Sequence, residues 1–299
     1  MSQKDSFIEI GKHEEKSRDR RLFFLEIFET VVFAFAVVAL INVFVAGFFV
    51  FDFKKINSME GELESGDRLV VLKAPYGPGI PFTEKNLPFL GSPRAGELFI
   101  VSYPDSSASK TVLRCAGSPG QRLYISDKRV ILDDEMLPGY GMEKNRRSPV
   151  LSPDVIPRDN LSEIIVPAIG DSLVLESADI FTMLYYKNII QSENPDARVS
   201  YKPLLLIGGD TVREFSLKEM KTHLDDYSEI TPENTDLISL SNIFRYIRSS
   251  SEADVYATVR ILFNEDPLDY YFVRRNYYFF ISDNWDKGYD SRYFGFLSG

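Results

Sequence analysis

Residues Ser282 to Gly295 read SDNWDKGYDSRYFG and follow directly on the apolar run NYYFFI, which is rich in strand-forming aromatic residues. Asp290 and Arg292 stand two positions apart. On an extended segment their side chains would therefore share one face and could pair with partners across a sheet. The spacing predicts that these charges have a structural role at the end of a β framework.

Short runs of Val, Ile, Leu, Phe and Tyr, punctuated by Gly and Pro, fill most of the chain before this block. Such runs at short spacing are typical of an antiparallel, mostly β domain. Gly117 followed by Pro119 and Gly120 has the composition of a turn. The main runs are DRLVVLKAP, GELFIVSYP, TVLRCAGSPG, RLYIS, RVILDDE, EIIVPAIGDSLVLE, VYATVRILFNED and DYYFVRRNYYFFISDN.

Residues 176–253 interrupt this pattern with two predicted helices, Phe181–Gln191 and Leu217–Tyr227. The second helix would begin at a capping box, because Ser216 is followed three residues later by Glu219. We therefore expect an α-containing insertion in the β domain.

The N-terminal part of the chain contains an apolar stretch, TVVFAFAVVALINVFVAGFFVF, from Thr30 to Phe51. A helix rises about 1.5 Å per residue, so this stretch could cross a ~30 Å hydrocarbon core. A cleaved signal sequence is disfavoured by the length of the stretch, by the lack of an Ala-X-Ala site, and by Glu26 and Glu29 at its start. Aromatic residues lie all round it, which disfavours a core helix of a globular protein.

Basic residues precede the apolar stretch and only Lys54 and Lys55 follow it closely. This bias predicts a single-pass protein of the cytoplasmic (inner) membrane with its N-terminus in the cytoplasm and its body outside. The predicted organisation is a cytoplasmic segment at 1–29, a transmembrane helix at 30–52, a β core at 53–175, the insertion at 176–253 and a C-terminal part of the β core at 254–299.

Composition excludes several classes of function. The chain has 299 residues and a formal net charge of −10, and no cluster of Lys and Arg indicates a nucleic-acid partner. The lone cysteine, Cys115, excludes an intrachain disulfide and is interpreted as a small buried hydrophobic residue. Neither a phosphate-binding glycine loop nor a metal-ligand spacing occurs, so we expect no cofactor and no metal.

Four blocks in order resemble the type I signal peptidases, which are membrane-anchored serine endopeptidases. The first is Ser58-Met59 with Gly66-Asp67 following, the second ends in Tyr103-Pro104, and the third is LRCAGSPG. The fourth is the C-terminal block, where the family pattern is Gly-Asp-Asn-Arg-X-X-Ser-X-Asp-Ser-Arg. The matching positions include Met59, Arg114, Gly117, Pro119, Gly120, Asp283, Asn284, Asp290, Ser291 and Arg292.

The resemblance implies that Ser58 is the nucleophile and that a lysine serves as its general base. Arg114 fixes the register of the third block, and the lysine position is then Leu113. The serine that would orient the lysine aligns with Gly288, and Ile56 stands where some members carry an oxyanion hydroxyl. These three absences predict an impaired or inactive enzyme, in which restoring the base would require both Leu113→Lys and Gly288→Ser.

No other residue is an obvious substitute for the base. Lys110 lies three residues before Leu113, which on a strand directs it to the opposite face. His13 precedes the apolar stretch and His223 lies in the insertion.

Three functions remain open from the sequence. The first is an active signal peptidase that uses Ser58 with an unrecognised base. The second is a pseudoenzyme that binds signal peptides or exported preproteins without cutting them, with the lipid bilayer and possibly the secretion machinery or another signal peptidase as partners. The third is a structural membrane-anchored β protein. We favour the second, because the residues at the site lack the groups that the chemistry requires.

Overall fold

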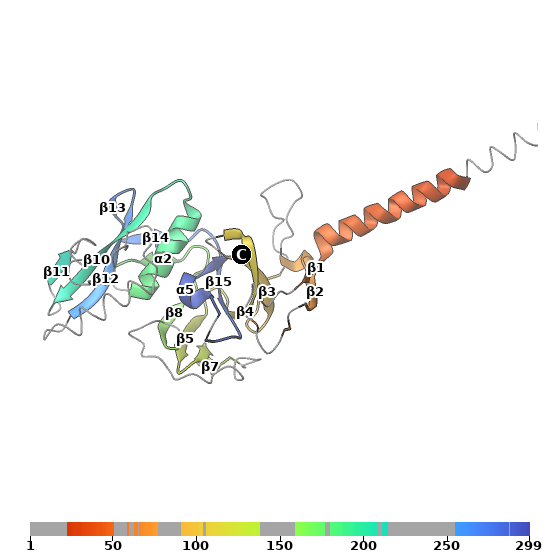
Figure 1. The fold of residues 1–299 in the computed structure, drawn as a ribbon. Coiled ribbons are helices and arrows are strands. Elements are labelled where there is room, and N and C mark those ends of the chain that lie inside the picture. Colours follow the sequence, from red (N-terminus) through yellow and green to blue (C-terminus); the bar gives the residue numbers. More distant parts are fainter. Residues whose placement is uncertain are drawn as a thin grey trace, which may run out of the picture. The chain divides into compact units, whose positions relative to one another are not determined.

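The structure is a computed structural model that describes residues 23–50, 59, 63–64, 66–76, 91–103, 106–137, 159–176, 180–207, 211–214, 255–286 and 288–299 (Figure 1). The chain forms two compact units, residues 1–49 with 68–91 and residues 50–67 with 92–299. Antiparallel strands dominate the second unit, and an apolar helix dominates the first. The prediction of a mostly β protein with an N-terminal apolar helix is confirmed.

The helix of the first unit runs from Phe23 to Val45 and is long and apolar enough to cross a membrane. Its last turn, η1 (Ile41–Val45), is a π-helix. The observed helix starts before the predicted stretch, which begins at Thr30. It also ends earlier, because Ala46–Val50 forms strand β1, which pairs with β2 (Arg68–Leu72).

Lys73 explains where this helix ends. Its backbone N–H donates to the carbonyl of Val45 at 2.8 Å, and its Nζ donates to the carbonyl of Asn42 at 2.8 Å. The last carbonyls of a helix have no partner within the helix, and a cation there also complements the helix dipole. Lys73 therefore stabilises the change from helix to strand at Ala46. The short helix η2 (Ala74–Tyr76) follows it.

The central sheet of the second unit has the order β16-β15-β4-β3. It brings together distant parts of the sequence, because β15 lies close to the C-terminus and β4 lies in the first half of the chain. The bounds are β3 (Leu98–Tyr103), β4 (Ser106–Gly117), β15 (Tyr277–Ile281) and β16 (Leu297–Ser298). The C-terminal block thus begins at the end of β15.

A second sheet has the order β7-β6-β5-β8. Its strands are β5 (Arg122–Ser126), β6 (Arg129–Leu132), β7 (Glu135–Met136) and β8 (Leu161–Ile165). The turn predicted before β5 is confirmed, since Gly120 has φ +84° and Gln121 N–H donates to the Ser118 carbonyl at 3.1 Å.

The segment interpreted from the sequence as an insertion contains α2 (Ile180–Glu193), which confirms the helix predicted at Phe181–Gln191. The helix predicted at Leu217–Tyr227 lies outside the described residues. A sheet of order β11-β10-β12-β13 follows α2 in the chain. Its strands are β10 (Val199–Ile207), β11 (Thr211–Glu214), β12 (Val255–Phe263) and β13 (Asp266–Pro267).

Strand β12 pairs with β10 from Val199↔Phe263 to Ile207↔Val255. This sheet therefore crosses the boundary drawn from the sequence between 176–253 and 254–299. A separate two-stranded sheet joins β9 (Ser172–Val174) to β14 (Tyr270–Phe272).

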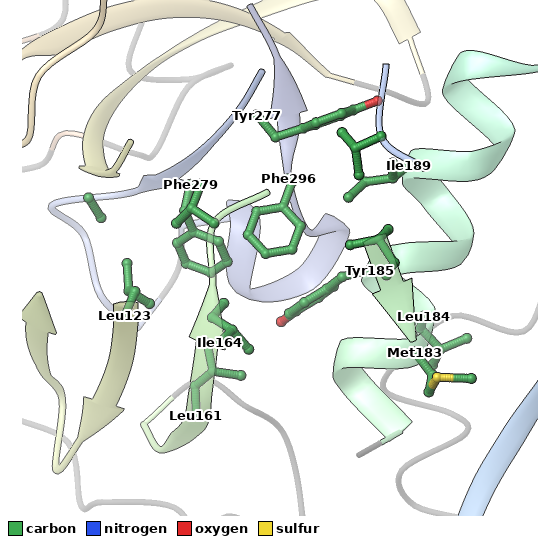
Figure 2. Close-up of a cluster of buried hydrophobic side chains, with 14 of the residues drawn as sticks. Leu123, Leu161, Ile164, Met183, Leu184, Tyr185, Ile189, Tyr277, Phe279 and Phe296 are labelled. Atoms are coloured by element: carbon green, nitrogen blue, oxygen red, sulfur yellow. The ribbon is translucent and has the colours of Figure 1, made fainter. Parts of the chain in front are cut away.

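Helix α2 is part of the main hydrophobic core and does not form a core of its own. Figure 2 shows Tyr185 of α2 beside Phe279 of β15 and Phe296, in a cluster that also holds Leu123 and Ile164. The ring of Tyr185 lies 6.3 Å from that of Phe279 and 5.8 Å from that of Phe296, both at steep interplanar angles. Such edge-to-face pairs add to the free energy of burial, so α2 helps to hold the C-terminal block in place.

Candidate active site

The position of the expected base, Leu113, lies in the middle of the central sheet. Leu113 pairs with Phe99 of β3, and its neighbour Arg114 pairs with Ile281 of β15. The Leu113 side chain is completely buried, at 0% exposure, whereas Lys110 is exposed. Lys110 therefore does not share the environment of Leu113, as the strand periodicity predicted.

Leu113 belongs to a second, smaller hydrophobic cluster, which we call the apolar site cluster. Its rings include Phe99 and Phe280, whose centroids lie 5.7 Å apart in an edge arrangement. The buried members are Leu113, Cys115, Tyr278, Phe280 and Phe294, and Phe99, Val101, Tyr103 and Leu297 pack against them.

Three titratable groups in this cluster are held in their neutral forms. Burial raises the pKa of the Cys115 thiol to about 11, and burial also raises the pKa of Tyr278 and of Tyr103. A thiol or phenol with such a pKa is protonated at neutral pH and does not accept a proton from a serine hydroxyl. Cys115 is buried and free, which confirms its interpretation as a hydrophobic core residue.

The nucleophile position, Ser58, lies outside the described residues, and so does Ile56. The next residue, Met59, is completely buried, and its carbonyl accepts a hydrogen bond from the Leu63 N–H at 3.1 Å. Met59 is thus a fully buried residue at this end of the first block.

A buried ion pair joins the third block to the fourth. The guanidinium of Arg114 donates to both carboxylate oxygens of Asp283, and its third hydrogen bond, from Nη1, goes to the carbonyl of Gly96 at 2.7 Å. The Asp283 side chain is fully buried and that of Arg114 nearly so. These paired hydrogen bonds offset the free-energy cost of removing the two charges from water.

Asp290 organises the end of the fourth block. Its carboxylate accepts hydrogen bonds from Nε and Nη2 of Arg292 at 2.8 and 2.6 Å, and one oxygen also accepts the Ser282 N–H at 2.9 Å. Asp290 also caps the short helix α5 (Ser291–Phe294), whose Ser291 Oγ accepts the Phe280 N–H at 2.9 Å. The prediction that Asp290 and Arg292 pair with partners across a sheet is wrong, because the helical turn at Ser291 folds them onto each other.

The guanidinium of Arg292 is entirely buried and lies 4.2 Å above the ring of Trp285. Burial acts to lower the pKa of Arg292, but the adjacent charge of Asp290 outweighs it and the pKa is raised. Trp285 in turn donates from Nε1 to Asp159 at 2.8 Å. The arginine is therefore a fixed, permanently charged part of the interior.

Asp159 and Lys128 also belong to this arrangement, although nothing in the sequence indicates it. The Nζ of Lys128, in the turn between β5 and β6, lies 3.2 Å from Asp286, and its backbone N–H donates to the Asp159 carbonyl at 2.9 Å. Lys128 is 2% exposed. No motif surrounds either residue, so only the folded chain brings them to the fourth block.

Gly288, the expected position of the orienting serine, is buried against Ser282. A Cβ added to Gly288 would overlap the Cβ and Oγ of Ser282 and would lie 2.8 Å from the carbonyl oxygen of Asn284. The Ser282 hydroxyl donates to that same carbonyl at 3.2 Å, and the Gly288 N–H also donates to it at 2.9 Å. The space that a side chain at 288 would need is thus occupied by Ser282, so Gly288→Ser would require Ser282 to move.

Comparison with known proteins defines the class to which this fold and these blocks belong. The family model for signal peptidase, peptidase S26, matches residues 24–299. The chain belongs to this family.

Two curated relatives are named signal peptidase I. The protein from Pseudomonas fluorescens is 33% identical over 79 residues, which are 26% of this chain and 28% of that protein. The protein from Pseudomonas aeruginosa is 30% identical over 81 residues, which are 27% of this chain and 28% of that protein. The aligned segments thus span little more than a quarter of these relatives.

Proposed function

We propose that this protein is a membrane-anchored member of the signal peptidase family that binds signal peptides of exported preproteins without cleaving them. The observation that carries the proposal is Leu113, which is completely buried in an apolar cluster where the family pattern has its lysine. Membership of the signal peptidase family supports signal peptides as the ligand. The apolar site cluster around Leu113 supports the loss of cleavage.

The chemistry explains why Leu113 matters. A serine hydroxyl must lose its proton to a neighbouring base as it attacks a carbonyl carbon. A leucine has no lone pair to accept it, and Cys115, Tyr278 and Tyr103 around it are held protonated. Loss of a positioned general base typically lowers a rate by about 10²- to 10⁴-fold. Ser58 would then be an ordinary hydroxyl group.

The parts of the site that persist are those that hold the fold. Arg114 with Asp283, and Asp290 with Arg292, are buried ion pairs with short hydrogen bonds. Keeping such pairs preserves the shape of the domain, and a binding protein needs the shape but not the base. This supports a scaffold that still receives a signal peptide.

The anchor is proposed to be the helix Phe23–Val45, with a cytoplasmic N-terminus. The basic residues that precede the helix in the sequence support this orientation. Protease added to spheroplasts should digest the body and spare the segment that precedes the helix. A protected body would contradict this topology.

Cleavage of a preprotein by purified wild type and by the Ser58→Ala variant tests the loss of turnover. The expected result is no difference between them, with Ser172→Ala, at an exposed serine in β9, as the matched control. A drop in cleavage only in Ser58→Ala would show an active peptidase with an unrecognised base.

Binding is measured in the same preparation by crosslinking a signal peptide that carries a photoreactive residue. The proposal requires saturable crosslinking that an unlabelled signal peptide displaces. If the peptide neither binds nor is cleaved, the protein does not act on signal peptides at all.

A further inference from the structure

The small sheet of β9 and β14 is apolar on both of its faces. Tyr271 and Leu173 pair across it on one face and lie in the main core, at 9% and 4% exposure. On the other face Tyr270 lies directly opposite Val174, and these side chains are 59% and 55% exposed. A sheet face that meets water normally carries polar residues. The exposed face of this sheet therefore has the composition of a surface that is covered.

Phe272 makes the exposed face continuous. It is 59% exposed and lies two positions after Tyr270, on the same face of the strand. The two ring centroids are 5.6 Å apart and the rings are nearly perpendicular. We call Val174, Tyr270 and Phe272 the aromatic ribbon face. Single exposed apolar residues are ordinary, whereas a contiguous group of them is typical of an interaction surface.

The aromatic ribbon face is held on a fixed scaffold. The pairing continues past the end of the strands, because the Leu175 N–H donates to the Asp269 carbonyl at 2.9 Å. From the buried face, the Tyr271 hydroxyl donates to the carboxylate of Glu193 in α2 at 2.8 Å. The exposed side chains are thus presented by a backbone that is secured from behind, which lowers the entropic cost of binding.

The neighbouring sheet shows that the chain elsewhere follows the usual alternation. Leu123 and Ile125 of β5 are buried, whereas Arg122 and Ser126 of the same strand are exposed. In β6 the first residue, Arg129, is exposed as well. The apolar residues on the outside of β9 and β14 are therefore a local feature and not a general property of this protein.

Two arginines indicate what kind of surface the aromatic ribbon face meets. Arg274 and Arg275 follow Phe272 closely and both are exposed, in a chain with a net charge of −10. The opposite end of β14 is preceded by an exposed carboxylate, Asp269. Exposed aromatic rings beside positive charge suit the headgroup region of a bilayer, where rings lie at the interface and arginines meet phosphates. The arginine end of β14 would then lie nearest to the headgroups.

The anchor makes a bilayer the favoured occupant over a protein. The helix Phe23–Val45 is long and apolar enough to cross a membrane, and it belongs to the same chain. A tether turns a second contact into an intramolecular event, so that a small patch is sufficient. A separate protein would have to supply that affinity through a larger interface.

We propose that the aromatic ribbon face is a lipid-contact surface, which places Tyr270, Phe272 and Val174 among the headgroups and the two arginines at lipid phosphates. This inference rests on the anchor of the proposed function and is independent of whether Ser58 is catalytic. It gives the body of the protein an attachment to the bilayer in addition to its helix.

The test uses the full-length chain in vesicles of phosphatidylethanolamine and phosphatidylglycerol. A thiol-reactive fluorophore is attached to Val174→Cys or to Phe272→Cys, and the native chain is the blank because Cys115 is buried. We expect lipids with a nitroxide in the headgroup region to quench both probes. Met136→Cys is the control, because Met136 is 60% exposed but belongs to β7 in another sheet; its probe should be quenched much less.

The outcomes separate failure of the anchor from failure of the inference. Extraction of the chain from the vesicles by alkaline carbonate would overturn the anchor and this contact together. A chain that resists extraction, but whose probes at 174 and 272 are not quenched, would overturn the inference alone. Equal quenching at 136 would also overturn it, because it would show only general proximity to the bilayer. Shielding of the probes from iodide without quenching by lipid would show that a protein covers the face instead.

Substitution of the two rings provides a second test that does not disturb the core. Tyr270→Ser with Phe272→Ser should reduce lipid quenching of the probe at 174, and should leave the unfolding midpoint nearly unchanged because both rings are exposed. Unchanged quenching would contradict the role of the rings.

Arg275→Gln tests the charge. Arg275 is chosen because Arg274 also donates to Asn194, at 3.2 Å. The ratio of bound to free ribbon, obtained from the quenched fraction, should fall about fivefold in vesicles that contain phosphatidylglycerol. It should not change in vesicles of phosphatidylcholine alone. Equal effects in the two lipids would contradict a contact between the arginine and anionic headgroups.

Discussion

The guanidinium of Arg114 and the carboxylate of Asp283 meet across 169 positions of sequence, through hydrogen bonds of 2.9 and 2.6 Å. This pair joins β4 to the segment that follows β15, and it is shielded from solvent. It fixes how the C-terminal block lies against the strand that carries Leu113. The geometry of the candidate site therefore depends on a contact between residues that are far apart in the sequence.

Asp283→Asn should destabilise the protein by about 3 to 5 kcal/mol, because it leaves the charge of Arg114 buried without its counterion. The measurement is chemical unfolding of the full-length protein in detergent. Arg122→Gln is the matched control, since Arg122 and Asp134 also form a 2.6 Å pair but have side chains that are 48% and 68% exposed. Arg122→Gln should lower the free energy of unfolding by less than about 1 kcal/mol. Equal losses would show that Asp283 and Arg114 are solvated.

Asp290→Asn should also be strongly destabilising, by about 3 kcal/mol or more, because Arg292 is fully buried and Asp290 is its ionic partner. Trp285 is the single tryptophan of the chain and lies under Arg292, so its fluorescence reports the unfolding of this region. Glu265→Gln removes an exposed partner of Arg198 and serves as the control. An unfolding midpoint unchanged by Asp290→Asn would contradict the buried pair.

Leu113→Ala should cost about 2 to 5 kcal/mol, because it leaves a cavity in the apolar site cluster. Leu113→Met keeps nearly the same volume and should cost less than about 1.5 kcal/mol. Both are measured by the free energy of unfolding. If both substitutions proved neutral, Leu113 would have to lie at the surface, which would contradict its place in the apolar site cluster.

Cys115 should make stability fall at alkaline pH. The folded pKa of about 11 lies above the ordinary value of 9.0, so the thiol contributes stability that is fully present below pH 9 and is lost as pH rises towards 11. A difference of about two pH units corresponds to roughly 2 to 3 kcal/mol. The free energy of unfolding is measured for wild type and for Cys115→Ala from about pH 8 to about pH 11. We expect it to fall more steeply with pH in the wild type than in Cys115→Ala. Parallel curves would show that the thiol ionises freely in the native state.

The native thiol should also resist alkylation at neutral pH, because burial disfavours the thiolate that reacts. Labelling of Cys115 should appear only when denaturant is added. Rapid labelling of the native protein would indicate that this part of the sheet opens.

Much of the fold could be predicted from the sequence. Alternating apolar runs and Gly-Pro turns specify strands because they depend on local periodicity, and every run quoted from the sequence contains a strand. The same holds for α2, whose residues 180–193 include the predicted helix. The end of the N-terminal helix was not predictable in this way, because it depends on Lys73, which reaches Asn42 from 31 positions away.

The same distinction between local pattern and tertiary contact applies to the candidate site. Residue identity and strand periodicity were enough to identify the family blocks, the leucine at position 113, the missing side chain at Gly288 and the burial of Cys115. The folded chain was needed to show that Asp290 pairs with Arg292, that Lys128 and Asp159 support the C-terminal block, and that Ser282 fills the space beside Gly288. Those facts depend on which backbone atoms approach closely once β15, α5 and β4 pack together, and no local pattern encodes such distances.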